Sequence, residues 1–176
     1  MNIDVNKYPV RRSNPIVKGS YGLPEDIQRY VVKGQGLSGI ELEKGDRLFL
    51  KNLEGNQICE ITIFDAMGNN NQNIINKKND IEDSFLKKVL TTSSDKFFLI
   101  QKLKNKNINL NKFFSTLIFN ESSKRDTSEE ILVNENCFAV IACPGKNMIV
   151  GNQNPPTDIE VIVKRINPKN NKLERI

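Results

Sequence analysis

The sequence of 176 residues contains no histidine and no tryptophan, and it has only three cysteines. Without an imidazole, catalytic triads, His-Glu zinc motifs and the His-x-Glu arrangement of deaminases are excluded. Any catalysis must therefore use cysteine, lysine, aspartate, glutamate or tyrosine. The cysteines form no Cys-x-x-Cys pair, and their odd number favours reduced, buried thiols. We accordingly expect no bound metal and no cofactor.

A long apolar run is also absent: no segment approaches the about 20 residues of a membrane span, and the N-terminus has no signal-peptide pattern. We therefore expect a cytoplasmic protein with no membrane partner. The net charge of +5 suggests phosphate binding, because basic faces attract nucleic acid. However, the basic residues are scattered, and the densest run, residues 102–106, has no interleaved aromatic residues. We interpret this run as solvated surface and expect no nucleic-acid partner.

The length fits one domain that buries its own core. Residues 1–24 contain three prolines and two glycines without periodicity, which predicts an extended N-terminal arm. Residues 25–168 form the predicted β-rich domain, and residues 169–176 a tail or linker. Strands are predicted at residues 27–32, 37–40, 47–53, 58–65, 97–101, 131–133, 137–142, 148–150 and 159–165. Glycine turns separate the first four, which predicts a β-meander in which 47–53 and 58–65 pair as a hairpin.

A helix is predicted to begin at residues 79–82, where a capping side chain and acidic residues accompany Ile81, Phe85 and Val89 at helical spacing. Residues 108–119 remain open between helix and strand, because the apolar residues from Leu110 to Ile118 fit a helical face while 113–119 fit a buried strand equally. The polar run 121–130 predicts a loop. The predicted fold class is mainly β, an antiparallel β-sandwich or barrel-like single domain with one or two short helices.

Closely spaced polar residues follow the turn of the predicted hairpin. Gln57 offers donors and an acceptor, while Glu60 and Asp65 offer carboxylates. Together with Asn56 they form the predicted ligand site, in which a carboxylate would hold an amine or guanidinium group. The alternative is that Gln57 bonds its own turn while Glu60 faces solvent or pairs with a lysine. The sequence leaves both interpretations open.

Cys143 is a candidate nucleophile, because a glycine turn and Lys146 beside it would lower the pKa of its thiol. We favour the alternative of a structural cysteine that closes a buried strand, since free cysteine is among the most buried residue types. Gly34, Gly36 and Gly39 match the dinucleotide-binding spacing, but no helix is predicted directly after them. We therefore interpret them as loop glycines.

Two segments of the chain resemble a known family. They are Lys44-Gly45-Asp46 with Glu54-Gly55-Asn56-Gln57-x-x-Glu60, and Cys143-Pro144-Gly145-Lys146-x-Met148 with residues 155–161 and Arg165. Together they resemble the urea carboxylase-associated domain family, in the form found at the N-terminus of aminomethyltransferase-like proteins related to the glycine-cleavage T protein. Stand-alone members of that family carry aspartate at the position of Glu60, and they have His and Cys clusters that this chain lacks.

The resemblance implies an accessory or ligand-binding β domain of amine or one-carbon metabolism. Its implied partners are a small amine or amide-like ligand and an aminomethyltransferase-like domain or protein. The alternative is a small stand-alone enzyme or binding protein for an amide, urea-like or methylated amine compound, with Glu60 or Asp65 as base and Cys143 as nucleophile. The sequence contains no evident catalytic constellation, so it decides neither enzymatic activity nor oligomeric state.

Overall fold

The computed structural model describes residues 2–3, 11–12, 15–16, 23–77, 80–145, 148–149 and 155–168. Its strands are β1 (Asn2–Ile3), β2 (Arg11–Arg12), β3 (Pro15–Ile16), β4 (Ile27–Val32), β5 (Gly36–Leu42), β6 (Arg47–Asn52), β7 (Cys59–Asp65), β8 (Asp80–Ile81), β9 (Ser115–Phe119), β10 (Thr127–Leu132), β11 (Cys137–Cys143), β12 (Met148–Ile149) and β13 (Ile159–Lys164). The helices are η2 (Gln72–Ile75), α1 (Phe85–Thr92) and α2 (Lys96–Asn105).

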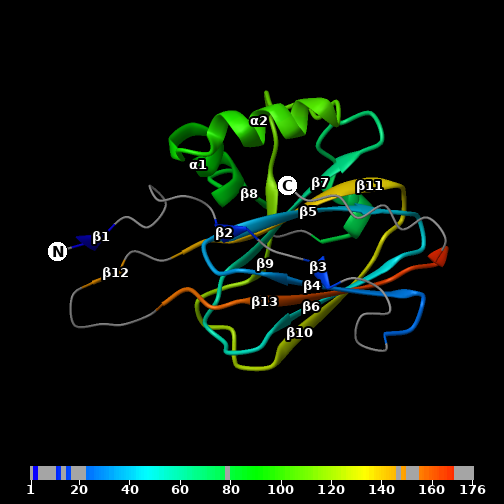
Figure 1. Cartoon of the computed structure of the whole chain (residues 1–176), viewed down its shortest axis with the longest axis horizontal. Helices are drawn as coiled ribbons and strands as arrows, with labels where there is room; N and C mark the ends of the chain where they lie inside the picture. The colour runs from blue at the N-terminus through cyan, green and yellow to red at the C-terminus, as the bar shows by residue number, and fades with distance from the viewer. Residues whose placement is uncertain are drawn as a thin grey trace.

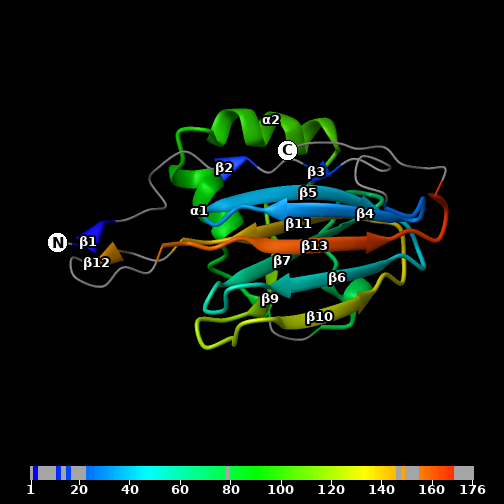
Figure 2. The same ribbon diagram turned by 60° about the horizontal axis from the view of Figure 1, so that its bottom comes forward.

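Two sheets of the described chain pack face to face, and α1 and α2 cover the outer face of one of them (Figure 1). That sheet has six strands in the order β2-β5-β11-β7-β9-β8, and the other has five in the order β10-β6-β13-β4-β3. All neighbours are antiparallel except β2 and β5. Figure 2 shows β4, β13, β6 and β10 in successive rows of the five-stranded sheet. β1 and β12 pair separately as a two-stranded ribbon.

The burial of the strands follows from this layering. Along β13, Ile159, Val161 and Val163 are buried while the residues between them are not, because one face of the five-stranded sheet meets solvent. In contrast, every residue of β11 is buried, because the helices cover its second face. One hydrophobic cluster therefore lies between the sheets, and a second lies beneath the helices.

The helical layer is held by its apolar face. The hydroxyl of Ser84 accepts a hydrogen bond from the backbone N–H of Lys87 and caps α1. Residues Phe85 and Val89 then pack on the sheet together with Leu99 and Leu103 of α2. Neither α1 nor α2, the α-helices of the described residues, has the length and apolar character needed to cross a bilayer. Because α1 and α2 pack on the sheet, they cover the face of β7 that carries Glu60.

The predicted fold class is confirmed: two antiparallel-dominated sheets with two short α-helices in the described chain. The strand predictions near 27–32, 37–40, 47–53, 58–65, 137–142, 148–150 and 159–165 also match observed strands. Residues 115–119 form a strand, which decides between the two alternatives for 108–119. Of the predicted arm, β2 and β3 join the sheets, whereas the predicted tail at 169–176 lies outside the described residues.

The predicted hairpin and β-meander are wrong. β6 pairs with β10 and β13, and β7 pairs with β11 and β9, so the two strands lie in different sheets. The side chain of Asn52 accepts a hydrogen bond from Gly55 N–H and donates to the carbonyl of Gln57, which holds the connection as it crosses between the sheets. Glycine turns mark a change of direction, but they do not specify which strand becomes the neighbour.

Local predictions failed at four further places. α1 begins at Phe85 and not at 79–82, because residues 80–81 form β8; Asn79 lies outside the described residues. Residues 97–101 belong to α2, since a short apolar run fits either period. Residues 127–130 of the predicted loop form part of β10, a polar edge strand. Gly36 and Gly39 lie within β5 and are not loop residues.

Candidate functional site

The four residues of the predicted ligand site do not form one cluster. Gln57 and Asn56 lie in the crossing before β7, Glu60 points from β7 toward the helices, and Asp65 ends the same strand. Since a strand rises about 3.3 Å per residue, Asp65 lies roughly 16 Å from Glu60 along β7. Two separate places must therefore be considered, one around Glu60 and one around Asp65.

The side chain of Gln57 links three segments of the chain by hydrogen bonds. Its side chain is buried, with 4% exposed, and the amide Nε2 donates to the carbonyls of Ile58 (2.8 Å) and Pro144 (2.9 Å). Its Oε1 accepts from the backbone N–H of Thr157 at 2.8 Å. Asn56 is exposed in the left-handed conformation, and its backbone N–H donates to the carbonyl of Ser123 at 2.7 Å. The polar groups of Gln57 are thus engaged within the protein.

Glu60 is a carboxyl group enclosed between the sheet and α1. It is 6% exposed, and Oε2 accepts a hydrogen bond of 2.7 Å from the backbone N–H of Phe85, the first residue of the helix. Burial raises the pKa of Glu60 from its ordinary 4.5 to about 7, against the opposing effects of that hydrogen bond and of Lys88. Glu60 therefore does not face solvent, it forms no ion pair with another described residue, and its pKa lies near neutral pH.

Cys143 has the surroundings of a structural thiol. It ends β11 in the core, fully buried, beside Cys59 on the neighbouring strand β7. Burial first, and then Cys59, raises the pKa of Cys143 well above its ordinary value. Lys146, the neighbour invoked for a lower pKa, lies outside the described residues. Burial likewise raises the pKa of Cys137 to about 12, so we expect both thiols to stay protonated at neutral pH.

Asp65 lines a cleft of about 270 Å³ that is rich in carboxylates. Its Oδ1 accepts the backbone N–H groups of Met67 and Asn69, both at 2.9 Å, which fixes the turn after β7. We call this space the acidic cleft; it is lined by Glu41, Leu42, Glu43, Asp65, Ala66, Lys106, Asn136, Cys137, Phe138 and Arg165. Strand pairing places Phe138 of β11 directly opposite Glu41 of β5, so the aromatic ring and the carboxylate share one face of the sheet.

A cation of the chain already occupies part of the acidic cleft. The ammonium group of Lys106, just after α2, lies 2.7 Å from a carboxylate oxygen of Glu41 and 6.0 Å from the ring centroid of Phe138. A carboxylate and an aromatic face together bind a positive charge by Coulomb attraction and by the ring quadrupole. The cleft therefore presents the two groups that recognise an organic ammonium ion.

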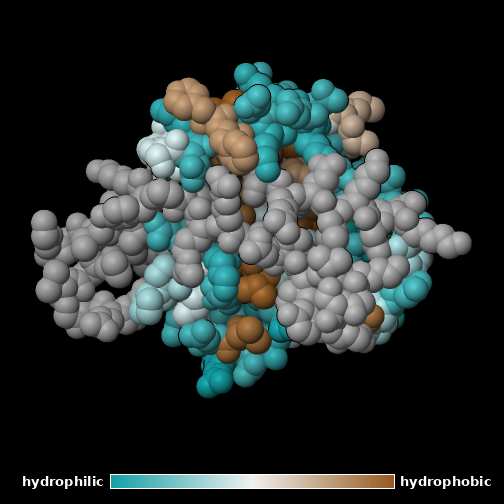
Figure 3. Space-filling model, viewed as in Figure 1, coloured by the Kyte–Doolittle hydropathy of each residue, from teal (hydrophilic) through white to brown (hydrophobic). Residues whose placement is uncertain are grey.

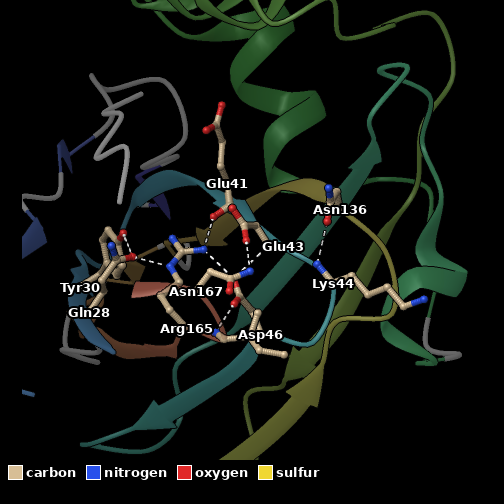
Figure 4. Close-up of polar contacts among 10 residues, drawn as sticks. Gln28, Tyr30, Glu41, Glu43, Lys44, Asp46, Asn136, Arg165 and Asn167 are labelled. Carbon is tan, nitrogen blue, oxygen red and sulfur yellow. Dashed lines mark hydrogen bonds and ion pairs between the residues drawn. The ribbon is translucent and has the colours of Figure 1, made fainter. Parts of the chain in front are cut away.

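Arg165, which lines the acidic cleft, forms a buried ion pair with Asp46 behind it (Figure 4). Nη1 of Arg165 donates to Oδ2 of Asp46 at 2.7 Å, with the side chains 8% and 0% exposed. Asp46 also accepts the backbone N–H groups of Glu43 (2.9 Å) and Ile166 (3.0 Å). The guanidinium group additionally donates to the carbonyl of Glu41 and to Gln28. The positive charge of Arg165 is thus directed at Asp46 and not at the carboxylates of the cleft.

The sequence reasoning found Asp65 but missed Glu41, Lys106 and Phe138. These residues come from three distant segments, and only the pairing of β5 with β11 brings Glu41 to Phe138. The alternation of β5 was the available signal, because it places Glu41 on the face opposite to Ile40 and Leu42. Among the described residues, no three cysteine, aspartate or glutamate side chains come together as a metal site.

Comparison with known proteins gives one relative and no family. No protein-family model matches the chain, so the resemblance to the urea carboxylase-associated family stays a prediction. The chain is similar to trimethylamine-oxide aldolase of Ruegeria pomeroyi, with 30% identity over 146 residues. The match covers 82% of this chain but only 18% of that relative, so the chain spans a small part of the protein it resembles.

Proposed function

We propose that this chain is an accessory β domain of amine metabolism that binds a small organic ammonium ion in the acidic cleft. The observation that carries the proposal is the position of Lys106, whose ammonium group lies between the carboxylate of Glu41 and the ring of Phe138. A ligand ammonium would replace that group, while Lys106, which is partly exposed, would turn toward solvent. The cleft volume of about 270 Å³ lies just below the usual range of small-molecule sites, so it suits a small ligand.

The surroundings of the other candidate residues support a binding role over a catalytic one. The thiol of Cys143 is buried, and Gln57 is engaged in holding the chain together. The relative is far longer than this chain and is named for an aldolase that acts on trimethylamine oxide, a methylated amine compound. We therefore infer that this domain serves a larger activity, acting with an aminomethyltransferase-like domain or protein.

Choline and its uncharged isostere 3,3-dimethylbutan-1-ol test the binding site, because they differ only in charge. We expect choline to raise the melting temperature in a dose-dependent manner, since ligand that binds only the folded state stabilises it. Replacing Glu41 with glutamine should abolish most of that rise. The Lys106→Met variant should bind choline more tightly by roughly five-fold, because it removes the competing cation and an exposed pair is worth up to about 1 kcal/mol.

The Lys124→Met variant is the matched control, because Lys124 is exposed and does not line the acidic cleft. It should leave the choline response unchanged. Equal responses to choline and to its isostere would contradict the proposal, as would an unchanged response in Glu41→Gln. The predicted partner is tested separately: an aminomethyltransferase-like protein mixed with this chain should co-elute with it in size-exclusion chromatography.

A second function, a small stand-alone enzyme acting on a methylated amine, is favoured by one observation. The pKa of Glu60 is about 7, which suits a general acid or base at neutral pH. The test is to incubate the protein with methylated amines and to follow their N-methyl resonances by NMR. Turnover that Glu60→Gln abolishes would favour the enzyme, and its absence would favour the accessory domain.

A further inference from the structure

A second cavity of about 490 Å³ opens in the helical layer. We call it the helical cavity; it is lined by Glu82, Lys87, Leu90, Thr91, Ile100, Lys104, Leu110, Asn111, Lys112, Phe113 and Phe114. It lies between α1, α2 and the segment before β9, and it shares no lining residue with the acidic cleft. Its volume falls within the range of small-molecule sites, about 300–1,000 Å³.

The walls of the helical cavity are apolar. Leu90 and Leu110 pack against the cluster beneath the helices and are only partly buried, and Phe113 is buried in that cluster. Two further phenylalanines of α2 reach the surface, since Phe97 is 75% exposed and Phe98 43% exposed. Figure 3 shows such hydrophobic side chains reaching the surface of the helical layer at the top of the view, among hydrophilic ones. A ligand here would bury an apolar body.

The rim of the cavity is basic. Lys104 and Lys112 form no ion pair among the described residues, and Lys112 instead lies 5.7 Å from the ring centroid of Phe114. Within the described part of the chain, Nζ of Lys87 has one long hydrogen bond, 3.5 Å, to the carbonyl of Glu82. Among the lining residues Glu82 is the one with a carboxylate, against the three lysines. An excess of positive charge therefore surrounds an apolar space.

We propose that the helical cavity binds a small organic anion, a carboxylate with an apolar body. The body would lie against Leu90, Ile100 and Leu110, and the carboxylate would pair with Lys104 and Lys112. The argument is independent of the proposed function, because the acidic cleft selects a cation and this cavity selects an anion. Loss of binding at one site would leave the other proposal standing.

Octanoate is the probe for this site, and octan-1-ol is its uncharged counterpart. We expect isothermal titration to detect octanoate binding, and amide resonances of residues 85–92, 96–105 and 110–114 to shift in a ¹H–¹⁵N NMR titration. Each of Lys104→Gln and Lys112→Gln should weaken octanoate binding by roughly five-fold, the value of an exposed charge pair. A Lys44→Gln/Lys124→Gln double variant, which matches the charge change of a Lys104→Gln/Lys112→Gln double variant, should bind octanoate as the parent does.

An Ile100→Glu variant tests the apolar wall. The introduced carboxylate should abolish octanoate binding, while the melting temperature reports whether the fold is retained. The proposal is overturned if octanoate does not bind, if octan-1-ol binds equally well, or if the shifted resonances lie away from the helical layer. It is also overturned if the lysine variants bind octanoate as tightly as the control pair does.

Discussion

Replacing Glu60 with glutamine should stabilise the domain above pH 7 and change its stability little at pH 4. The carboxyl group is enclosed between β7 and α1, and burial raises its pKa from 4.5 to about 7. The folded state therefore binds this proton more tightly than the unfolded state does. The stability that protonated Glu60 contributes is fully present below pH 4.5. It falls as the pH rises from 4.5 to 7, and it is lost above pH 7.

The size of the effect follows from the same values. Each pKa unit corresponds to about 1.4 kcal/mol, so a rise from 4.5 to about 7 corresponds to about 3 kcal/mol of stability lost between pH 4 and pH 8. Glutamine stays neutral throughout, and its side-chain oxygen can still accept the hydrogen bond from Phe85 N–H. The variant should therefore exceed the parent by up to about 3 kcal/mol at pH 8.

Urea unfolding of both proteins at intervals between pH 4 and pH 8 measures this difference. Subtracting the two curves removes the titration of all other groups, so the free-energy difference should rise only within the stated window. Glu54→Gln is the matched control, because Glu54 is exposed, and its difference curve should be flat. A flat curve for Glu60→Gln, or a glutamine variant that is less stable at pH 8, would refute the reasoning.

Three further predictions concern buried groups. Arg165→Met should cost about 3 to 5 kcal/mol in urea unfolding, because it leaves the carboxylate of Asp46 buried without its partner; adding Asp46→Asn should recover part of the loss. Thr157→Val should stabilise the fold by up to about 1 kcal/mol, measured in the same way, because the buried hydroxyl of Thr157 has no hydrogen-bond partner among the described residues. Cys143 should react with iodoacetamide only after unfolding, as peptide mass spectrometry would show, because its thiol is buried and its pKa is raised; rapid labelling of the native protein would contradict this.

The strands could be predicted because burial leaves a local signature. Alternation along residues 159–164 and continuous burial along 137–143 both follow from the chain's own side chains. Strand pairing leaves no such signature. β6 and β7 are separated by a short turn, yet they belong to opposite sheets, because each also completes a row of strands from distant parts of the chain. Helix α2 was missed because its apolar residues recur too briefly to fix a period.

The candidate sites were less predictable than the fold, because each combines side chains from segments far apart in the sequence. The interpretation of Gln57 and Glu60 as one site depended on their spacing of three residues, but Gln57 lies in the crossing before β7 and Glu60 on β7, in different surroundings. Glu60 could be recognised as a polar residue on a strand, whereas its raised pKa depends on the helix that covers it. That helix was itself predicted to begin several residues too early.

The positions of the charged residues, and not the net charge, determine the character of each cavity. A net charge of +5 suggested a basic surface, yet the two cavities have opposite character. The end of α2 lies at their boundary: Lys104 lines the helical cavity, and Lys106, two residues later, enters the acidic cleft and pairs with Glu41. Since exposed charges act over about 8 Å at physiological salt, each cavity responds mainly to its own lining. Composition therefore could not reveal either site, because the sum of charges conceals their separation.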